Sequence, residues 1–339
     1  MATIFGAQRL IIQLKLRHIT KASSSGLLCR RQFAGLANEA NATKEARLLL
    51  AGPDARGIVA SFSHLLFSRG CGIVDCTSES SEIDAKVDKR GQHSRRMFFQ
   101  RILFDYSNVS VVERNVIEDE INDLCVRFGM ESQLSWGGDK RRRIAIFVSK
   151  YDHCLWELLL RQRAGELDCE IAMVISSHEK LRHVADTFDI PYHVFPITKD
   201  NKLEQEEKQI SLIEQHNVDL LVLARYMQIL SPSFCSRFQN QIINIHHSFL
   251  PAFRGGSPYH KAHERGVKLV GATAHYATTE LDEGPIIEQD IMRVSHRDDV
   301  KDLIRKGRTL EKTCLTNAVK AHLDDRIITH RSKCIVFAE

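Results

Sequence analysis

Residues 242–251 read IINIHHSFLP and place titratable side chains at the end of an apolar run. Ile242, Ile243 and Ile245 are apolar and β-branched, a pattern that predicts a short buried strand. Pro251 has no backbone N–H to donate, so the chain is expected to turn away there. Because open parallel sheets bind ligands beyond the carboxyl ends of their strands, this stretch predicts a functional site at such an end.

Short apolar runs alternate with amphipathic segments upstream of this strand. The expected strands are 142–149, 170–177, 192–197 and 218–227, and the expected helices are 152–165, 178–189 and 202–216. Alternation of this kind favours a parallel sheet with helices on both faces. Residues 144–339 are therefore expected to form a Rossmann-like α/β domain with a mostly parallel sheet.

A different order of elements precedes this domain. Strand, helix, strand, strand, helix and strand are expected, in that order, at 46–52, 53–70, 72–80, 97–107, 116–129 and 130–136. The order βαββαβ is that of a ferredoxin-like fold. The polar stretch 137–143 is expected to be a linker, so that residues 45–136 form a first domain.

The first 33 residues have the composition of a targeting segment. They contain six Lys or Arg, clustered serines and no Asp or Glu, which is typical of a mitochondrial transit peptide. The arginines at 30 and 31 resemble those of a matrix-protease site and predict cleavage near Phe33. The alternative interpretation is a disordered basic segment at the N-terminus.

The charge of the rest of the chain is nearly balanced. The whole chain has 47 Lys and Arg against 43 Asp and Glu, and removal of the six leaves a formal charge near −2. No nucleic-acid surface is therefore expected. No apolar run reaches the roughly 18 residues of a membrane span, so no membrane partner is expected. Nine cysteines without a CxxC favour free thiols in a reducing compartment.

A second polar segment, GATAHYATTELDEGP at 271–285, follows the opening stretch. It is expected to place His275 on a strand and Asp282 in a loop that ends at Gly284 and Pro285. Burying an amide, an imidazole and a carboxylate costs free energy unless these groups pair with one another. The two segments are therefore expected to build one shared site.

Together these segments resemble the 10-formyltetrahydrofolate-dependent formyltransferases and hydrolases. The resemblance rests on the pattern N-x-H-x-S-x-L-P at 244–251, on GATAHYATTELDEGP and on LARYMQILSP at 223–232. It implies that Asn244, His246 and Asp282 are catalytic. It also implies no metal and no cofactor, because 10-formyltetrahydrofolate is itself the substrate.

The resemblance extends to the substrate-binding residues. It implies that main-chain groups around Met227, Gln228 and Leu230 bind the pterin, with Thr279 in the facing loop. Many relatives have arginine in place of Gln228, so a role for that side chain is the weaker expectation. His275 is expected to bond to the site from its strand, or else only to pack.

His247 is expected to belong to the site as well. A doubled histidine is typical of the hydrolase branch, where transferases commonly have proline. His247 is expected to tune His246 or to restrict the acceptor to water, and the alternative is a structural hydrogen bond.

The segment 52–73, GPDARGIVASFSHLLFSRGCGI, resembles an ACT domain, a small-molecule-sensing module that usually pairs with a second copy. The resemblance implies an amino-acid effector site around Asp54 and Gly57, and a homo-oligomer, either a dimer or a tetramer. The alternative is that this domain mediates oligomerisation alone.

The combination of these two domains resembles the formyltetrahydrofolate deformylase family, which hydrolyses 10-formyltetrahydrofolate to formate and tetrahydrofolate. A formyltransferase with an amine acceptor, such as glycinamide ribonucleotide, is the alternative. That enzyme holds the acceptor phosphate on a glycine-rich turn, because backbone amides approach phosphate where side chains are absent. Residues 149–158, SKYDHCLWEL, contain no glycine at this position.

Two other classes of function agree less well with the sequence. Five histidines between 246 and 275 raise the possibility of a metal-dependent hydrolase, but no H-E-x-x-H or similar ligand spacing is present. A catalytically silent folate or amino-acid sensor would not need the complete set of Asn244, His246 and Asp282.

Overall fold

The computed structural model describes residues 44–81, 96–138, 141–252 and 258–339. The expected transit peptide at 1–33 lies outside these residues. Within the described residues, no helix combines the length and apolar composition that a membrane span requires. All eight cysteines in this part of the chain are free thiols.

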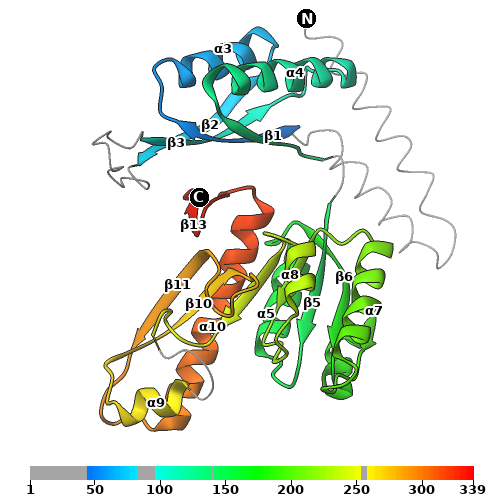
Figure 1. The fold of residues 1–339 in the computed structure, drawn as a ribbon, viewed down its shortest axis with the longest axis vertical. Helices are drawn as coiled ribbons and strands as arrows, with labels where there is room; N and C mark the ends of the chain where they lie inside the picture. Colours follow the sequence, from blue (N-terminus) through cyan, green and yellow to red (C-terminus); the bar gives the residue numbers. More distant parts are fainter. Residues whose placement is uncertain (1–43, 82–95, 139–140, 253–257) are drawn as a thin grey trace, which may run out of the picture. The chain divides into compact units, whose positions relative to one another are not determined.

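The N-terminal region contains a four-stranded antiparallel sheet covered by two helices on one face (Figure 1). Its elements are β1 Glu45–Pro53, α3 Ile58–Ser68, β2 Gly72–Ser81, β3 Met97–Asp105, α4 Val111–Phe128 and β4 Glu131–Trp136. The strand order β2-β3-β1-β4 confirms the ferredoxin-like arrangement. Buried apolar residues from α3, α4 and the sheet form one core between the two layers.

The second sheet has seven strands in the order β11-β10-β9-β8-β5-β6-β7. Its strands are β5 Arg142–Val148, β6 Cys169–Ser176, β7 Tyr192–Val194, β8 Leu220–Leu223, β9 Ile242–His246, β10 Leu269–Tyr276 and β11 Ile286–Arg293. Strands β5 to β9 are parallel, whereas β10 and β11 run antiparallel to their neighbours. The predicted α/β fold with a mostly parallel sheet is thus confirmed.

Helices pack on both faces of this sheet. They are α5 His153–Arg163, η1 Glu179–Leu181, α6 Arg182–Asp186, α7 Lys202–Gln215, α8 Pro232–Arg237, α9 Pro258–Glu264 and α10 Val300–Leu323, and a hairpin of β12 Ile327–His330 and β13 Lys333–Val336 follows. One core joins α5 and α10 to the first face, and a second core joins α7 and α8 to the other. The sheet is therefore buried on both sides, as its apolar strands require.

Several predicted elements were too long, among them the helix expected at 53–70, which spans only Ile58–Ser68. The strand expected at 218–227 ends at Leu223, because Arg225 adopts a left-handed backbone with φ 64° that cannot continue a strand. The strand expected at 192–197 ends at Val194, shortly before Pro196. The helix expected at 178–189 is divided into the short helices η1 and α6.

Helix α10 begins at a capping box and passes close to α9. The Asp299 side chain accepts from the Asp302 N–H, and the Asp302 side chain accepts from the Asp299 N–H. A Cβ on Gly307 would lie 1.9 Å from the Tyr259 hydroxyl oxygen, so only glycine permits this approach. The contact places Tyr259 beside the residue one helical turn further along, Glu311.

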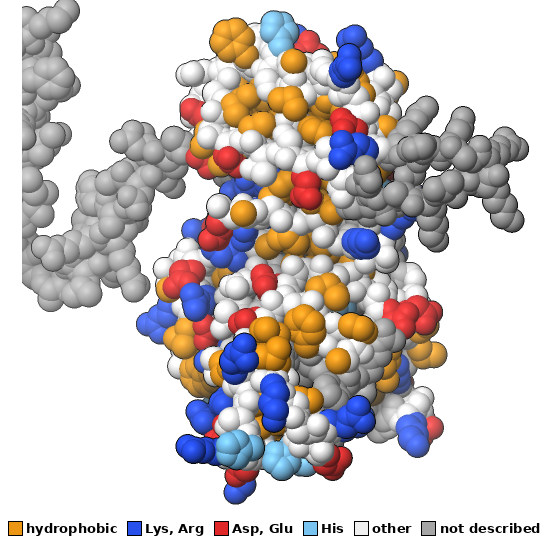
Figure 2. Space-filling view, turned by 90° about the vertical axis from the view of Figure 1, so that its left-hand side faces the viewer, with side chains coloured by type: hydrophobic (Ala, Val, Ile, Leu, Met, Phe, Trp, Pro, Cys, Tyr) orange, Lys and Arg blue, Asp and Glu red, His pale blue; other side chains and the backbone are white. Residues whose placement is uncertain are grey.

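Charges of both signs are interspersed on the exposed face shown in Figure 2. Lys and Arg alternate there with Asp and Glu over the described surface, and no single-sign patch covers this face. This distribution agrees with the balanced charge of the chain after its first 33 residues.

Candidate active site

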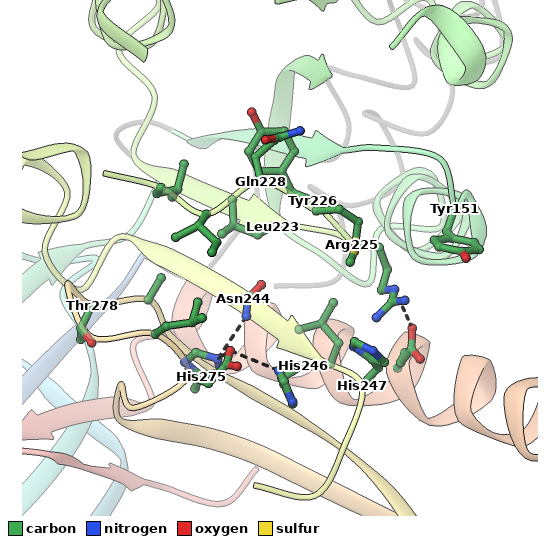
Figure 3. Close-up of a pocket in the computed structure, with 18 of the residues that line it drawn as sticks. Tyr151, Leu223, Arg225, Tyr226, Gln228, Asn244, His246, His247, His275 and Thr278 are labelled. Atoms are coloured by element: carbon green, nitrogen blue, oxygen red, sulfur yellow. Dashed lines mark hydrogen bonds and ion pairs between the residues drawn. The ribbon is translucent and has the colours of Figure 1, made fainter. Parts of the chain in front are cut away.

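A cavity of about 600 Å³ opens where β8 and β9 end. The loop that follows β8 forms one wall, and the loop between β10 and β11 forms another (Figure 3). Side chains of α9 and α10 close its far end. The cavity therefore occupies the sheet edge that the opening stretch predicted.

The structure brings the three residues expected to be catalytic together. Asn244 and His246 are two residues apart on β9, so their side chains point to the same face of the sheet. His246 Nδ1 lies 3.1 Å from Asp282 Oδ1. All three residues line the cavity, and Figure 3 shows Asn244 and His246 on β9.

Asp282 reaches this face through a tightly folded loop. Its backbone has a left-handed φ of 58°. A Cβ on Gly284 would lie 1.7 Å from the Tyr276 carbonyl oxygen, so the loop can return to the sheet only with glycine at this position. The loop thus carries Asp282 back over the end of β9.

The Asp282 carboxylate and the His246 imidazole form one hydrogen-bonded pair. The hydrogen bond from His246 is the main reason why the pKa of Asp282 lies below its usual value, although burial opposes this shift. Asp282 is therefore ionised at neutral pH, and His246 directs Nδ1–H towards it. His246 Nε2 is buried and has no hydrogen-bond partner among the described residues, which leaves it for a ligand.

His275 holds the amide of Asn244. Its Nδ1 lies 2.9 Å from the Tyr276 carbonyl oxygen and therefore carries the proton, so Nε2 accepts from Asn244 Nδ2 at 3.1 Å. Burial lowers the pKa of His275, in keeping with a neutral ring. One N–H of the Asn244 amide is thus fixed by His275, and the second is left for a ligand.

His247 lies behind His246 at the edge of the cavity. Its ring centroid is 5.4 Å from that of His246 and 6.0 Å from that of Tyr259. Burial, assisted by the nearby Arg225 guanidinium, lowers the pKa of His247 to about 4. His247 is therefore neutral at physiological pH.

The other expected substrate-binding residues also line the cavity, namely Met227, Gln228, Leu230 and Thr279. The Met227 N–H already donates to the Ser149 hydroxyl at 3.0 Å. A ligand beside Met227 would therefore meet its carbonyl oxygen rather than its N–H. Their roles in binding stay predictions.

Asp54 and Gly57 lie outside this cavity, in the loop between β1 and α3. Gly57 has a left-handed φ of 92° and precedes the first residue of α3. The Asp54 carboxylate accepts from the Ser80 hydroxyl on β2. The effector role of these two residues stays a prediction.

A charged cluster that the sequence did not predict lies at the far end of the cavity. Glu311 is a charged residue on the buried, mostly apolar face of α10, and it is only 1% exposed. It accepts from the Tyr259 hydroxyl at 2.7 Å, pairs with His153 Nε2 at 2.8 Å and lies 3.3 Å from Arg225 Nε. A single carboxylate among the buried apolar positions of α10 was the signal that could have indicated this cluster.

Part of this cluster has the composition of a metal site. Ligand atoms of His153, Cys154 and Glu311 lie within 4.8 Å of one another. However, Glu311 already bonds to Tyr259 and His153, with the Arg225 cation beside it. Burial also raises the pKa of Cys154 well above its usual value, which opposes a thiolate ligand. These residues therefore fit an ion-pair cluster better than a metal site.

Comparison with known proteins identifies the family. A family model described as formyl transferase matches residues 142–319. A formyltetrahydrofolate deformylase from Synechocystis sp. is 46% identical over 296 residues, which cover 86% of this chain and 98% of the relative. The chain belongs to the formyltetrahydrofolate deformylase family. A crystal structure of a family member from Pseudomonas syringae pv. tomato has a TM-score of 0.80 and 38% identity, and covers 91% of this chain and all of that chain.

Transformylases are more distant from this chain than the deformylases are. A glycinamide ribonucleotide transformylase from Symbiobacterium toebii has a TM-score of 0.56 and 29% identity. The match covers 61% of this chain and 98% of that one, whereas the deformylase match covers 91% of this chain. The likeness to deformylases thus extends over more of the chain.

The half-buried His247 predicts a pH dependence of stability. Its pKa rises from about 4 in the folded state to about 6.5 in the unfolded state, so only the unfolded chain binds this proton between those pH values. Folding stability is therefore lost as the pH falls through this window, by on the order of 3 kcal/mol. We expect His247→Asn to reduce the slope of stability against pH in urea melts from pH 4 to 7.

His263→Asn is the matched control, since His263 is exposed on α9 and lies outside the cavity. Equal slopes for His247→Asn and the original protein would contradict the assignment of a neutral His247 in the folded state.

Proposed function

We propose that the protein hydrolyses 10-formyltetrahydrofolate to formate and tetrahydrofolate. The observation that carries this proposal is the convergence of Asn244, His246 and Asp282 in one cavity of a deformylase-family chain. The reaction needs no second substrate other than water. Activity of this kind releases the one-carbon unit as formate and regenerates free tetrahydrofolate.

The geometry supports a specific division of roles. Water attacks the formyl carbon and Asp282 accepts its proton, while the carbonyl oxygen becomes an oxyanion. The free N–H of Asn244 and an N–H at Nε2 of His246 donate to this oxyanion, while the Asp282 carboxylate holds the other ring nitrogen, Nδ1, at 3.1 Å. As the C–N bond breaks, N10 takes the bonding electron pair and a proton from the Asp282–His246 pair.

The main alternative is formyl transfer to an amine. The loop after β5, where a transformylase has its glycine-rich turn, here places Tyr151 in the cavity wall, and the first residue of α5, His153, lies there as well. Side chains at these positions leave no stretch of bare backbone for an acceptor phosphate. Incubation with 10-formyltetrahydrofolate alone separates the two activities, because only a hydrolase releases formate without an acceptor.

Substitution of the three converging residues tests this proposal. We expect Asn244→Ala, His246→Ala and Asp282→Ala each to lower the rate of formate release by about 100-fold or more, since each removes a group that stabilises the transition state. Formate release and thermal melting are measured on the same preparations.

His263→Ala is the matched control and is expected to retain the original rate. A folded Asp282→Ala variant that releases formate at a near-normal rate would remove Asp282 from the mechanism.

We propose that residues 45–136 form an ACT domain that mediates homo-oligomerisation and binds an amino-acid effector. Strand β2 is an edge strand that is exposed along almost its whole length. Ile73 and Val74 on this strand are 41% and 55% exposed. An exposed edge with apolar side chains supports pairing with a second copy of the chain, as a dimer or as part of a tetramer.

An amino-acid panel tests the effector proposal. We expect one amino acid to raise the melting temperature of the protein, because a ligand at 100 times its Kd stabilises the folded state by about 2.7 kcal/mol. Asp54→Ala is expected to abolish this response while leaving the particle mass from light scattering unchanged. A panel without any response would leave oligomerisation as the only proposed role of the domain.

We further propose that residues 1–33 direct the protein to the mitochondrial matrix. The six Lys and Arg, the serines and the lack of acidic residues in this segment support the proposal.

A fluorescent fusion tests the targeting. Residues 1–40 fused to a fluorescent protein are expected to be imported into mitochondria and shortened near Phe33. Changing Arg30 and Arg31 together to Ala should shift or abolish the cleavage, which mass spectrometry of the imported protein detects. A diffuse fusion that keeps its N-terminus would instead support the alternative interpretation of residues 1–33, a basic segment without a targeting function.

A further inference from the structure

The far end of the cavity differs in charge from the rest of the site. We call it the basic arm and define it by His153, Arg225, Arg308, Tyr151, Tyr259 and Glu311. Its two guanidinium groups lie on the ring of Tyr151, with centroid distances of 5.3 Å for Arg225 and 5.8 Å for Arg308. Glu311 is its single carboxylate, so the basic arm has excess positive charge.

The carboxylate of Glu311 is fully occupied by its neighbours. Oε1 accepts from Tyr259, and Oε2 bonds to His153. Burial alone would raise the pKa of Glu311, but His153, Arg225 and Tyr259 outweigh this effect and hold the pKa below its usual value. Glu311 therefore stays ionised and anchors the arm.

Arg225 keeps hydrogen-bonding capacity that Glu311 does not use. Its side chain is only 10% exposed, and its Nε lies within ion-pair distance of Glu311 without a hydrogen bond to any described residue. A buried guanidinium with an N–H that makes no hydrogen bond costs free energy unless a ligand or a small movement of its neighbours satisfies it. The left-handed backbone of Arg225, with φ 64°, adds a further free-energy cost at this position.

The arm is continuous with the reacting groups. His247 lies next to His246 on one side and next to Tyr259 on the other. Figure 3 shows Arg225 and His247 together at one end of the cavity, with Asn244 and His246 further along it. A small molecule released beside His246 therefore reaches Arg225 by passing His247.

We propose that Arg225 binds the formate product and that the basic arm is the place to which formate moves after C–N cleavage. The inference rests on the proposed hydrolysis, which yields formic acid. This acid loses its hydroxyl proton to solvent, and the resulting carboxylate matches the planar fork of a guanidinium. Glu311 is a positioning residue that holds Arg225 by charge and competes with formate for it.

Inhibition by the product tests the proposal. Sodium formate replaces sodium chloride at constant ionic strength, and its inhibition constant is measured against 10-formyltetrahydrofolate. Arg225→Gln is expected to raise this constant by about tenfold or more, since a charge-assisted hydrogen bond is lost. Glu311→Gln is expected to lower it, because the competing carboxylate is gone.

Arg237→Gln is the matched control, because Arg237 pairs with Glu214 on the surface and lies outside the cavity. Its inhibition constant is expected to equal that of the original protein. An unchanged constant in folded Arg225→Gln would overturn the proposal. Where Arg225→Gln fails to fold or turn over, ¹³C-formate binding to Glu311→Gln decides, and binding no tighter than in the original protein overturns it.

The folate glutamate tail also ends in carboxylates, and it is the other source of this chemistry. If Arg225→Gln instead raised KM for a polyglutamylated substrate and left formate inhibition unchanged, the arm would bind the tail and the formate proposal would be wrong. Failure of the original protein to release any formate would refute the proposed function itself, a result distinct from both.

Discussion

The antiparallel pairing of β9 with β10 is the constraint on which the site depends. In this register His275 lies opposite Asn244, and Thr273 lies opposite His246. Residues opposite each other in an antiparallel pair point to the same face. His275 can therefore hold the Asn244 amide, and the loop after β10 can return Asp282 to His246. A shift by one residue would turn the histidine away from the amide.

The same strand explains why the polar side chains of the site gather on one face of the sheet. On β9, alternate side chains serve opposite purposes, with Ile243 and Ile245 in the core beneath α10 and Asn244 and His246 in the cavity. The buried pairs that result are each hydrogen-bonded, which offsets the cost of removing charge from water. The Asp282–His246 pair and the Glu311 cluster are thus separate solutions to the same energetic problem.

Sequence patterns predicted the local features of this site but not its long-range charges. The β-branched run at 242–245 predicted β9 because burial and propensity agree there. Asp282 was expected on the basis of family motifs, yet the reversed direction of β10 and the tight return at Gly284 came only from the structure. The left-handed Arg225 shortened β8 against its apolar pattern.

Glu311 was missed for a related reason. It lies more than 80 residues from Arg225 in the sequence and on a helix whose pattern predicts only a core face. Tertiary packing brings the two together. Gly307 lets Tyr259 approach α10, where its hydroxyl donates to Glu311 as well. Side chains of Tyr151 and His153 then fill the end of the cavity where a transformylase would expose backbone to phosphate. This end therefore retains positive charge but lacks the bare backbone of a phosphate cradle, which is why we propose a small carboxylate rather than a phosphate as its ligand.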